Sequence, residues 1–185
     1  MKIGLVWLAI CTAVAVCSTA GATQSARPVS ESASHGLVRT GLLSVGGGRV
    51  HLTDYTNSDS STSSAILTGA AGDYGRGSLN QSTGHFVLQL SRGSFTLQFS
   101  DLDAAFLAAL RRLTVNRWTC SAFARVSGTA PIVAGTGTGL YAHLTGAFSL
   151  TITLDEVFHP GGCSELGPFA AQKIVTSGWG TIKDH

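Results

Sequence analysis

The sequence predicts an all-β domain, mainly antiparallel, that folds as a closed or nearly closed β-barrel with one short amphipathic helix. Three observations predict it. Apolar and polar residues alternate with period two along most of the chain after Gly41, glycine-rich turns separate the alternating runs, and one segment alone has helical spacing. Many short antiparallel strands favour closure, because closure removes exposed sheet edges. A β-sandwich is the alternative.

The alternation defines several strands. Phe86, Leu88 and Leu90 share one face, and Phe95, Leu97 and Phe99 share another after a turn at Arg92-Gly93, where Gly93 supplies a positive φ. Two further apolar stripes are Trp118, Cys120, Ala122, Ala124 and Val126, and then Phe148, Leu150, Ile152 and Leu154. Additional strands are expected near residues 49–54, 64–67, 139–143 and 171–182.

Residues 100–113 break this period. Leu102, Phe106, Leu110 and Leu113 follow helical spacing. We expect Ser100 to cap the helix with Asp103 in the capping-box position, and Arg111-Arg112 to suit its C-terminal end.

The N-terminus has the features of a signal peptide. Lys2 precedes an apolar run from Ile3 to Val16, and Ala20-Gly21-Ala22 gives the small-residue exit. The run is too short for a transmembrane anchor, which takes roughly 20 apolar residues. We therefore expect residues 1–22 to be removed, or a few more if cleavage follows Ala26, and the mature chain to be secreted or extracytoplasmic.

The remaining chain divides into two parts. Residues 23–40 are rich in Ser, Ala and Thr and predict a flexible arm, and residues 41–185 predict a single domain. In an oxidising compartment the two cysteines outside the signal peptide, Cys120 and Cys163, are expected to form one disulfide.

The composition constrains the partners. The formal net charge is +2, with 12 basic and 10 acidic residues, which argues against nucleic acid or an anionic membrane as the main partner. No integral membrane span is expected in the mature chain, and no cofactor or metal ligand pattern is present. Oligomeric state is left open.

Two stretches resemble known proteins. Thr68 to Gly75, followed by Leu90 to Phe95, resembles a group of secreted actinobacterial proteins of uncharacterised function. Ala134 to Tyr141, with Gly146 before a long alternating strand, is similar to the glycine-rich hairpin of allene oxide cyclase and dirigent barrels. The resemblance implies a barrel and carries over no catalytic residue. Gly135, Gly137 and Gly139 lack the following helix or lysine of a nucleotide site, so they predict tight turns.

Candidate site residues are few. The glycine-flanked segment with Asp73, Tyr74 and Arg76 could present polar groups to a ligand, although a structural turn is the plainer interpretation. Tyr141 and His143 are further candidates. Asp155-Glu156 is interpreted as surface charge, because adjacent strand residues point to opposite faces.

Two functions remain in competition. The first is an exported binding protein that contacts a small apolar ligand or another surface through the barrel mouth or through residues 55–64 and 69–77. The second is an allene oxide cyclase-like or dirigent-like enzyme that confines a reactive intermediate in an apolar cavity, with Tyr141 or His143 as polar groups. A filled interior would favour binding.

Overall fold

The computed structural model describes residues 47–57, 63–159, 161, 163 and 169–184, all within a compact unit, Leu43–His185. The expected signal peptide and flexible arm lie outside the described residues. The elements in chain order are β1 (Gly48–Asn57), β2 (Ser63–Gly69), β3 (Asp73–Asn80), β4 (His85–Leu90), β5 (Gly93–Gln98), α1 (Ser100–Leu110), β6 (Ser121–Pro131), the 3₁₀ turn η1 (Gly139–Tyr141), β7 (Leu144–Phe158) and β8 (Phe169–Asp184).

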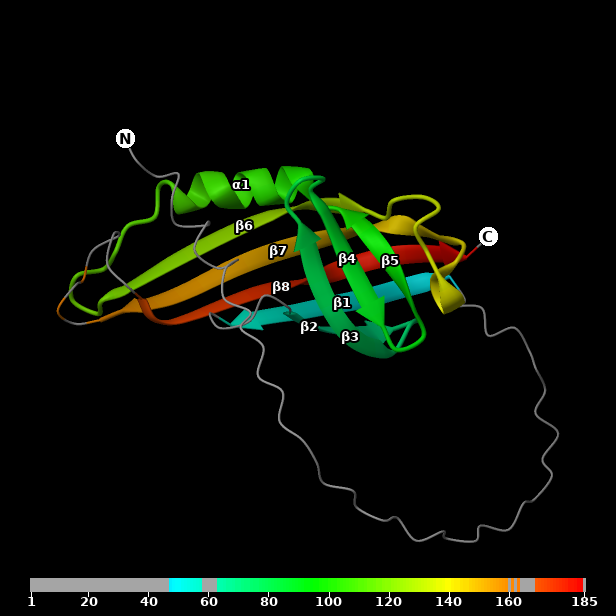
Figure 1. The fold of residues 1–185 in the computed structure, drawn as a ribbon, viewed down its shortest axis with the longest axis horizontal. Helices are drawn as coiled ribbons and strands as arrows, with labels where there is room; N and C mark the ends of the chain where they lie inside the picture. The colour runs from blue at the N-terminus through cyan, green and yellow to red at the C-terminus, as the bar shows by residue number, and fades with distance from the viewer. Residues whose placement is uncertain (1–46, 58–62, 160, 162, 164–168, 185) are drawn as a thin grey trace, which may run out of the picture. The chain divides into compact units, whose positions relative to one another are not determined.

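The eight strands form one antiparallel sheet in the order β5-β4-β3-β2-β1-β8-β7-β6. The sheet curls strongly into a half-barrel, and α1 lies along β6 (Figure 1). The predicted all-β, barrel-like class with one short helix is therefore confirmed. The sandwich alternative is wrong, because the described strands pair in a single sheet.

One face of the sheet is apolar and encloses the core, and we call it the inner face. Its strands contribute alternate residues, as in Phe148, Leu150, Ile152 and Leu154 of β7, which are all buried. Phe95 stacks on Phe148 and lies against Tyr141, with ring centroids 6.3 and 5.3 Å apart. The large side chains that are almost fully buried are Tyr141, Phe95, Phe148, Leu52, Leu88, Leu97, Leu150, Leu154, Ile182 and Val50.

The free edge of β5 is closed by the segment that follows β6. Leu97 bridges to Ile132, and the amide of Val133 donates to the carbonyl of Thr96 at 2.9 Å. Further along, the amide of Thr138 donates to the carbonyl of Ser94, also at 2.9 Å. Helix α1 covers the β6 side, where Leu102 packs beside Gly128. The β5 edge therefore has backbone partners, whereas α1 packs on β6 through side chains.

The turn between β4 and β5 approaches η1 so closely that both sides require glycine. Gly93 has φ +145° and a Cβ there would lie 2.1 Å from the carbonyl oxygen of Thr138. Gly139 has φ +57° and its Cβ would lie 2.4 Å from the carbonyl oxygen of Arg92. The predicted role of these glycines in tight turns with close backbone approach is confirmed.

Several local expectations were wrong. The turn residues of the β4–β5 hairpin are Ser91 and Arg92, because Gly93 already pairs with Leu90. Residues 139–143 begin with a 3₁₀ turn instead of a strand, since the amides of Tyr141 and Ala142 donate to the nearby carbonyls of Thr138 and Gly139. Trp118 precedes β6 and is 98% exposed, because a turn anchored on Asn116 delays the strand to Ser121.

Two further expectations were also corrected. Ser100 is not the N-cap of α1, since Phe99 holds that position and the Ser100 hydroxyl donates to Asp101. Residues 73–77 belong to strand β3, not to a loop, because they pair with both β2 and β4.

Cys120 and Cys163 lie at disulfide distance, with 5.1 Å between their Cα atoms, as predicted.

Within the described part of the chain, no helix combines the length and apolar character needed to cross a bilayer.

Gly180 of β8 offers a test of the packed interior. A Cβ there would lie 2.5 Å from Cδ1 of the buried Phe148 ring. We expect Gly180→Ala to lower the free energy of unfolding by about 1–3 kcal/mol, because an overfilled core forces side chains out of their rotamers. Gly72→Ala is the matched control, since nothing lies within 4 Å of its added Cβ. Equal urea midpoints for the two variants would contradict this packing.

Candidate functional site

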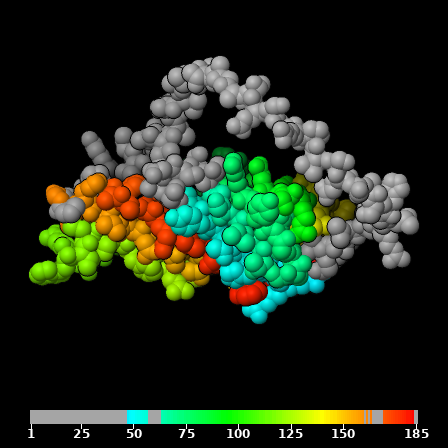
Figure 2. Space-filling model, turned by 90° about the horizontal axis from the view of Figure 1, so that it is seen from below, coloured from blue at the N-terminus to red at the C-terminus, as the bar shows by residue number. Residues whose placement is uncertain are grey.

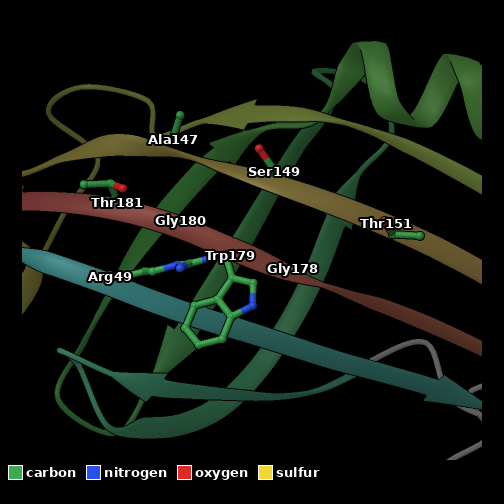
Figure 3. A pocket seen from close by; sticks show the side chains of 8 residues that line it. All are labelled: Arg49, Ala147, Ser149, Thr151, Gly178, Trp179, Gly180 and Thr181. Atoms are coloured by element: carbon green, nitrogen blue, oxygen red, sulfur yellow. The ribbon is translucent and has the colours of Figure 1, made fainter.

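The described residues form an open groove on the outer face of the sheet, across β1, β8 and β7. Its volume is about 720 Å³. Figure 3 shows Arg49 of β1 and Trp179 of β8 side by side in this groove. The residues that line it are Arg49, Ala147, Ser149, Thr151, Gly178, Trp179, Gly180 and Thr181. We call it the outer groove.

Strand register builds the outer groove. Trp179 lies opposite His51 of β1 and Ser149 of β7, whereas Arg49 lies opposite Thr181. The neighbouring residues in each strand, such as Val50 and Phe148, point into the core. Period-two alternation therefore fixes which side chains reach the groove.

The indole of Trp179 is held in place and still accessible. The guanidinium carbon of Arg49 lies 4.5 Å from the ring centroid, within cation–π range. His51 contacts the same ring edge-on, with 4.7 Å between centroids. Even so, Trp179 keeps 47% of its surface exposed. The groove therefore offers a positioned aromatic surface to solvent.

The outer groove carries uncompensated positive charge. Ion pairs between described residues are Arg92–Asp73 and Lys173–Asp155, so Arg49 has no carboxylate partner among them. The other polar side chains that line the outer groove are the hydroxyls of Ser149, Thr151 and Thr181. The groove thus combines hydroxyl donors and acceptors with the indole and the Arg49 guanidinium that lies over it.

A second polar cluster lies at the closed edge, around the buried carboxylate of Asp73. The hydroxyl of Tyr141 donates to Oδ2 at 2.6 Å and the amide of Tyr74 donates to Oδ1 at 2.8 Å. Ser91 donates to the same carboxylate, and Arg92 contributes its amide and its Nε, each at 3.3–3.4 Å. Five donors from three segments therefore converge on one side chain that has no exposed surface.

These contacts decide the protonation of the cluster. Burial alone raises the pKa of Asp73, but the hydrogen bonds from Ser91, Tyr141, Tyr74 and Arg92 outweigh it and lower the pKa to about 2. Burial and the adjacent carboxylate raise the pKa of Tyr141 above its usual range. Near neutral pH, Asp73 therefore stays ionised and Tyr141 stays protonated. The hydrogen bond between them stabilises the fold and does not serve proton transfer.

The five predicted ligand-site residues are not brought together. Asp73 and Tyr141 meet inside the molecule, whereas Tyr74 is 70% exposed on the outer face of β3. Arg76 is exposed on the same face, and His143 is exposed between η1 and β7.

A third cluster faces the inner side between β1, β2 and β3. Asp54 is only 3% exposed, and neither its Oδ1 nor the hydroxyl oxygen of Ser63 has a hydrogen-bond partner among the described residues. Gly77 leaves room for both oxygens, since a Cβ there would lie 2.5 Å from Ser63 Oγ and 2.7 Å from Asp54 Oδ1. Burial raises the pKa of Asp54 to about 6, and the nearby Ser63 hydroxyl offsets part of this effect.

Sequence reasoning missed Arg49 and Trp179. They are 130 positions apart in the chain numbering, and only the pairing of β1 with β8 makes them neighbours. A usable signal was present in β8, where Trp179 occupies a polar-face position between Ser177 and Thr181. A large aromatic residue on the polar face of an alternating strand marks a position to examine for binding, although a single one is common on protein surfaces.

Comparison with known protein families, curated proteins and solved structures finds no match for this chain.

The two buried carboxylates predict opposite dependences of stability on pH. The folded-state pKa of Asp54 is raised from 3.8 to about 6, so the free energy of unfolding should fall as the pH rises through this window, by up to about 3 kcal/mol. The folded-state pKa of Asp73 is lowered from 3.8 to about 2, so its contribution is present above that window and lost as the pH falls through it.

Urea unfolding across this pH range checks both signs. Asp54→Asn should flatten the decline between pH 3.8 and about 6. Asp73→Asn should instead lower stability near neutral pH by about 2 kcal/mol, because it removes a charged hydrogen-bond acceptor. A decline that persists unchanged in Asp54→Asn would show that another group causes it.

Proposed function

We propose that this chain is an exported binding protein that takes its ligand in the outer groove, at Trp179 and Arg49. The observation that carries the proposal is an exposed indole that contacts His51 and Arg49, where Arg49 has no carboxylate partner in the described part of the chain, on a surface lined with hydroxyls. Export rests on the signal-peptide pattern of residues 1–22 and is compatible with the pairing of Cys120 and Cys163.

The packed interior supports a ligand on the outside. The inner face is occupied by large buried side chains, among them Phe95, Phe148 and Tyr141, whose rings contact each other. A ligand placed there would have to displace core residues, which costs several kcal/mol for each large side chain moved. Binding a small apolar molecule inside the half-barrel is therefore the weaker form of the hypothesis.

The chemistry of the outer groove favours a saccharide that carries a negative charge. An indole surface packs against the apolar C–H face of a sugar ring, and hydroxyl side chains can exchange hydrogen bonds with the sugar hydroxyls. The guanidinium of Arg49 matches a carboxylate or phosphate geometrically as well as by charge. An open groove also accommodates one section of a longer chain.

The enzyme hypothesis has less support. Its candidate Tyr141 donates a hydrogen bond to Asp73 inside the core, and its candidate His143, two residues further along, is exposed to solvent. A general acid or base has to reach the substrate within hydrogen-bond distance. No pair of these groups lines a common cavity among the described residues, so we do not propose a reaction.

Export has a direct test. We expect the protein secreted by its own host to have the mass of a chain that begins at Thr23 or within a few residues of it, and to gain two hydrogens on reduction. Intact mass spectrometry with and without reductant measures both. A secreted chain that retained Met1 would contradict the proposed signal peptide.

Ligand binding can be followed by the fluorescence of Trp179. Trp7 lies in the expected signal peptide, so Trp118→Phe leaves Trp179 as the indole of the exported chain. We expect oligogalacturonate, as an acidic probe, to change its emission and to bind more tightly than uncharged N-acetylglucosamine oligomers. Trp179→Ala should weaken binding measured by calorimetry by about tenfold or more, equivalent to about 1.4 kcal/mol.

Two variants make this test specific. Arg49→Gln should reduce the preference for the acidic probe and leave the affinity for the neutral one nearly unchanged, because it removes charge at the edge of the indole. Tyr74→Ala is the control, since it deletes another exposed outer-face aromatic residue away from the groove. Equal losses in Trp179→Ala and Tyr74→Ala would place binding elsewhere.

A further inference from the structure

One end of the sheet gathers exposed apolar side chains at a distance from the outer groove. At this end β8 begins at Phe169, whereas β1 pairs with β8 only from Lys173 onward, so β6, β7 and β8 extend beyond β1 (Figure 1). In the space-filling view the same strands form the left end of the coloured surface (Figure 2). Its exposed residues are Trp118 at 98%, Phe123 at 59%, Val157 at 47% and Phe169 at 40%. We call these four residues the apolar tip.

Strand pairing brings these residues to the same end of the sheet, with Phe123 and Val157 on its outer face and Phe169 beside the buried Phe158. Val157 of β7 lies opposite Ser121 of β6 and Ala171 of β8, and Phe158 lies opposite Phe169. Phe123 is the next outward residue of β6 after Ser121. The tip therefore combines the ends of three strands with the turn that precedes β6.

Trp118 is presented on a well-defined turn. Its amide donates to Asn116 Oδ1 at 2.9 Å. The backbone groups of Asn116 and Ser121 close the turn by two hydrogen bonds, one in each direction. The amide of Phe158 then donates to the carbonyl of Cys120 at 2.7 Å, which fixes the turn to the end of β7. Because the turn is already ordered, burying this indole against a partner would cost little conformational entropy. Its exposure therefore makes it a suitable contact residue.

The tip also carries positive charge. Arg111 and Arg112 follow the helix on the way to this turn, Arg117 precedes Trp118, and Arg125 is the next outward residue after Phe123; all four are exposed. Two described acidic residues lie nearby: Asp155 pairs with Lys173, and Glu156 keeps its charge while it accepts a hydrogen bond from the neutral Gln172, so the basic residues outnumber the acidic ones. The chain as a whole is close to neutral, yet this end is cationic.

We propose that the apolar tip docks on an anionic lipid surface, with Trp118 in the interfacial layer and the arginines against lipid head groups. Trp favours the membrane–water interface, and each arginine near an anionic surface strengthens attachment by roughly fivefold. Four apolar side chains are few for a stable protein interface, which takes about 20–30 residues a side, whereas they suffice for reversible attachment when aided by charge. The tip holds the exported chain at the membrane while the outer groove stays free.

Vesicle sedimentation tests this attachment with the exported chain. We expect binding to vesicles of phosphatidylcholine mixed with phosphatidylglycerol to be at least about tenfold tighter than to phosphatidylcholine alone, and to weaken at high salt. In Trp179→Phe the emission of Trp118 should shift to the blue on binding the mixed vesicles. Comparable binding to both vesicle types, or no binding to either, would overturn the proposal.

Matched variants locate the contact. Trp118→Ala and Arg117→Glu should each weaken vesicle binding by about fivefold or more, with unchanged urea midpoints because both side chains are exposed. Tyr74→Ala, which removes an exposed aromatic residue from β3, should bind as the unaltered chain does. Full retention of vesicle binding by Trp118→Ala would exclude the tip, whatever the result at the outer groove.

Discussion

The fold of the described domain depends on how the free edge of its curled sheet is closed. The segment after β6 folds back along β5, and the buried carboxylate of Asp73 ties that segment to β3 and to the β4–β5 turn through Tyr141, Ser91 and Arg92. An ionised carboxylate is tolerated there because five donors replace its water. The close approach of Gly93 to η1 brings the donors within reach. The buried Asp73 carboxylate therefore adds side-chain hydrogen bonds to the backbone bonds that close this edge.

The closed interior determines where function can lie. Large apolar side chains fill the inner face, and the Tyr141 hydroxyl, which could have served chemistry, is committed to Asp73. Among the described residues, Asp54 Oδ1 and the Ser63 hydroxyl are buried without a hydrogen-bond partner, and burial raises the pKa of Asp54. With the interior occupied, the outer face and the strand ends carry the accessible chemistry.

Two exposed indoles mark those surfaces and suit different partners. Trp179 lies in a groove among hydroxyls beside a single guanidinium, which fits a hydrated, acidic ligand. Trp118 projects from a turn among phenylalanine, valine and several arginines, which fits the boundary of an anionic bilayer. The difference follows from what surrounds each ring, since tryptophan itself serves both polar and apolar contacts.

The sequence by itself determined the class of fold and which residues face the core, because alternation along a strand is a local property that each segment carries alone. Alternation therefore predicted the Phe148 to Leu154 stripe, and helical spacing predicted the helix after Ser100. The pairing of Cys120 with Cys163 was predicted from the two cysteines outside the expected signal peptide. Local turns were less predictable from the sequence. At Trp118 and within residues 139–143, backbone amides donate to groups two or three residues away and form turns where strands were expected. Only the tertiary structure decided that Tyr141 meets Asp73 and that Arg49 meets Trp179, since these contacts depend on the register of strands far apart in the chain and on how tightly the sheet curls.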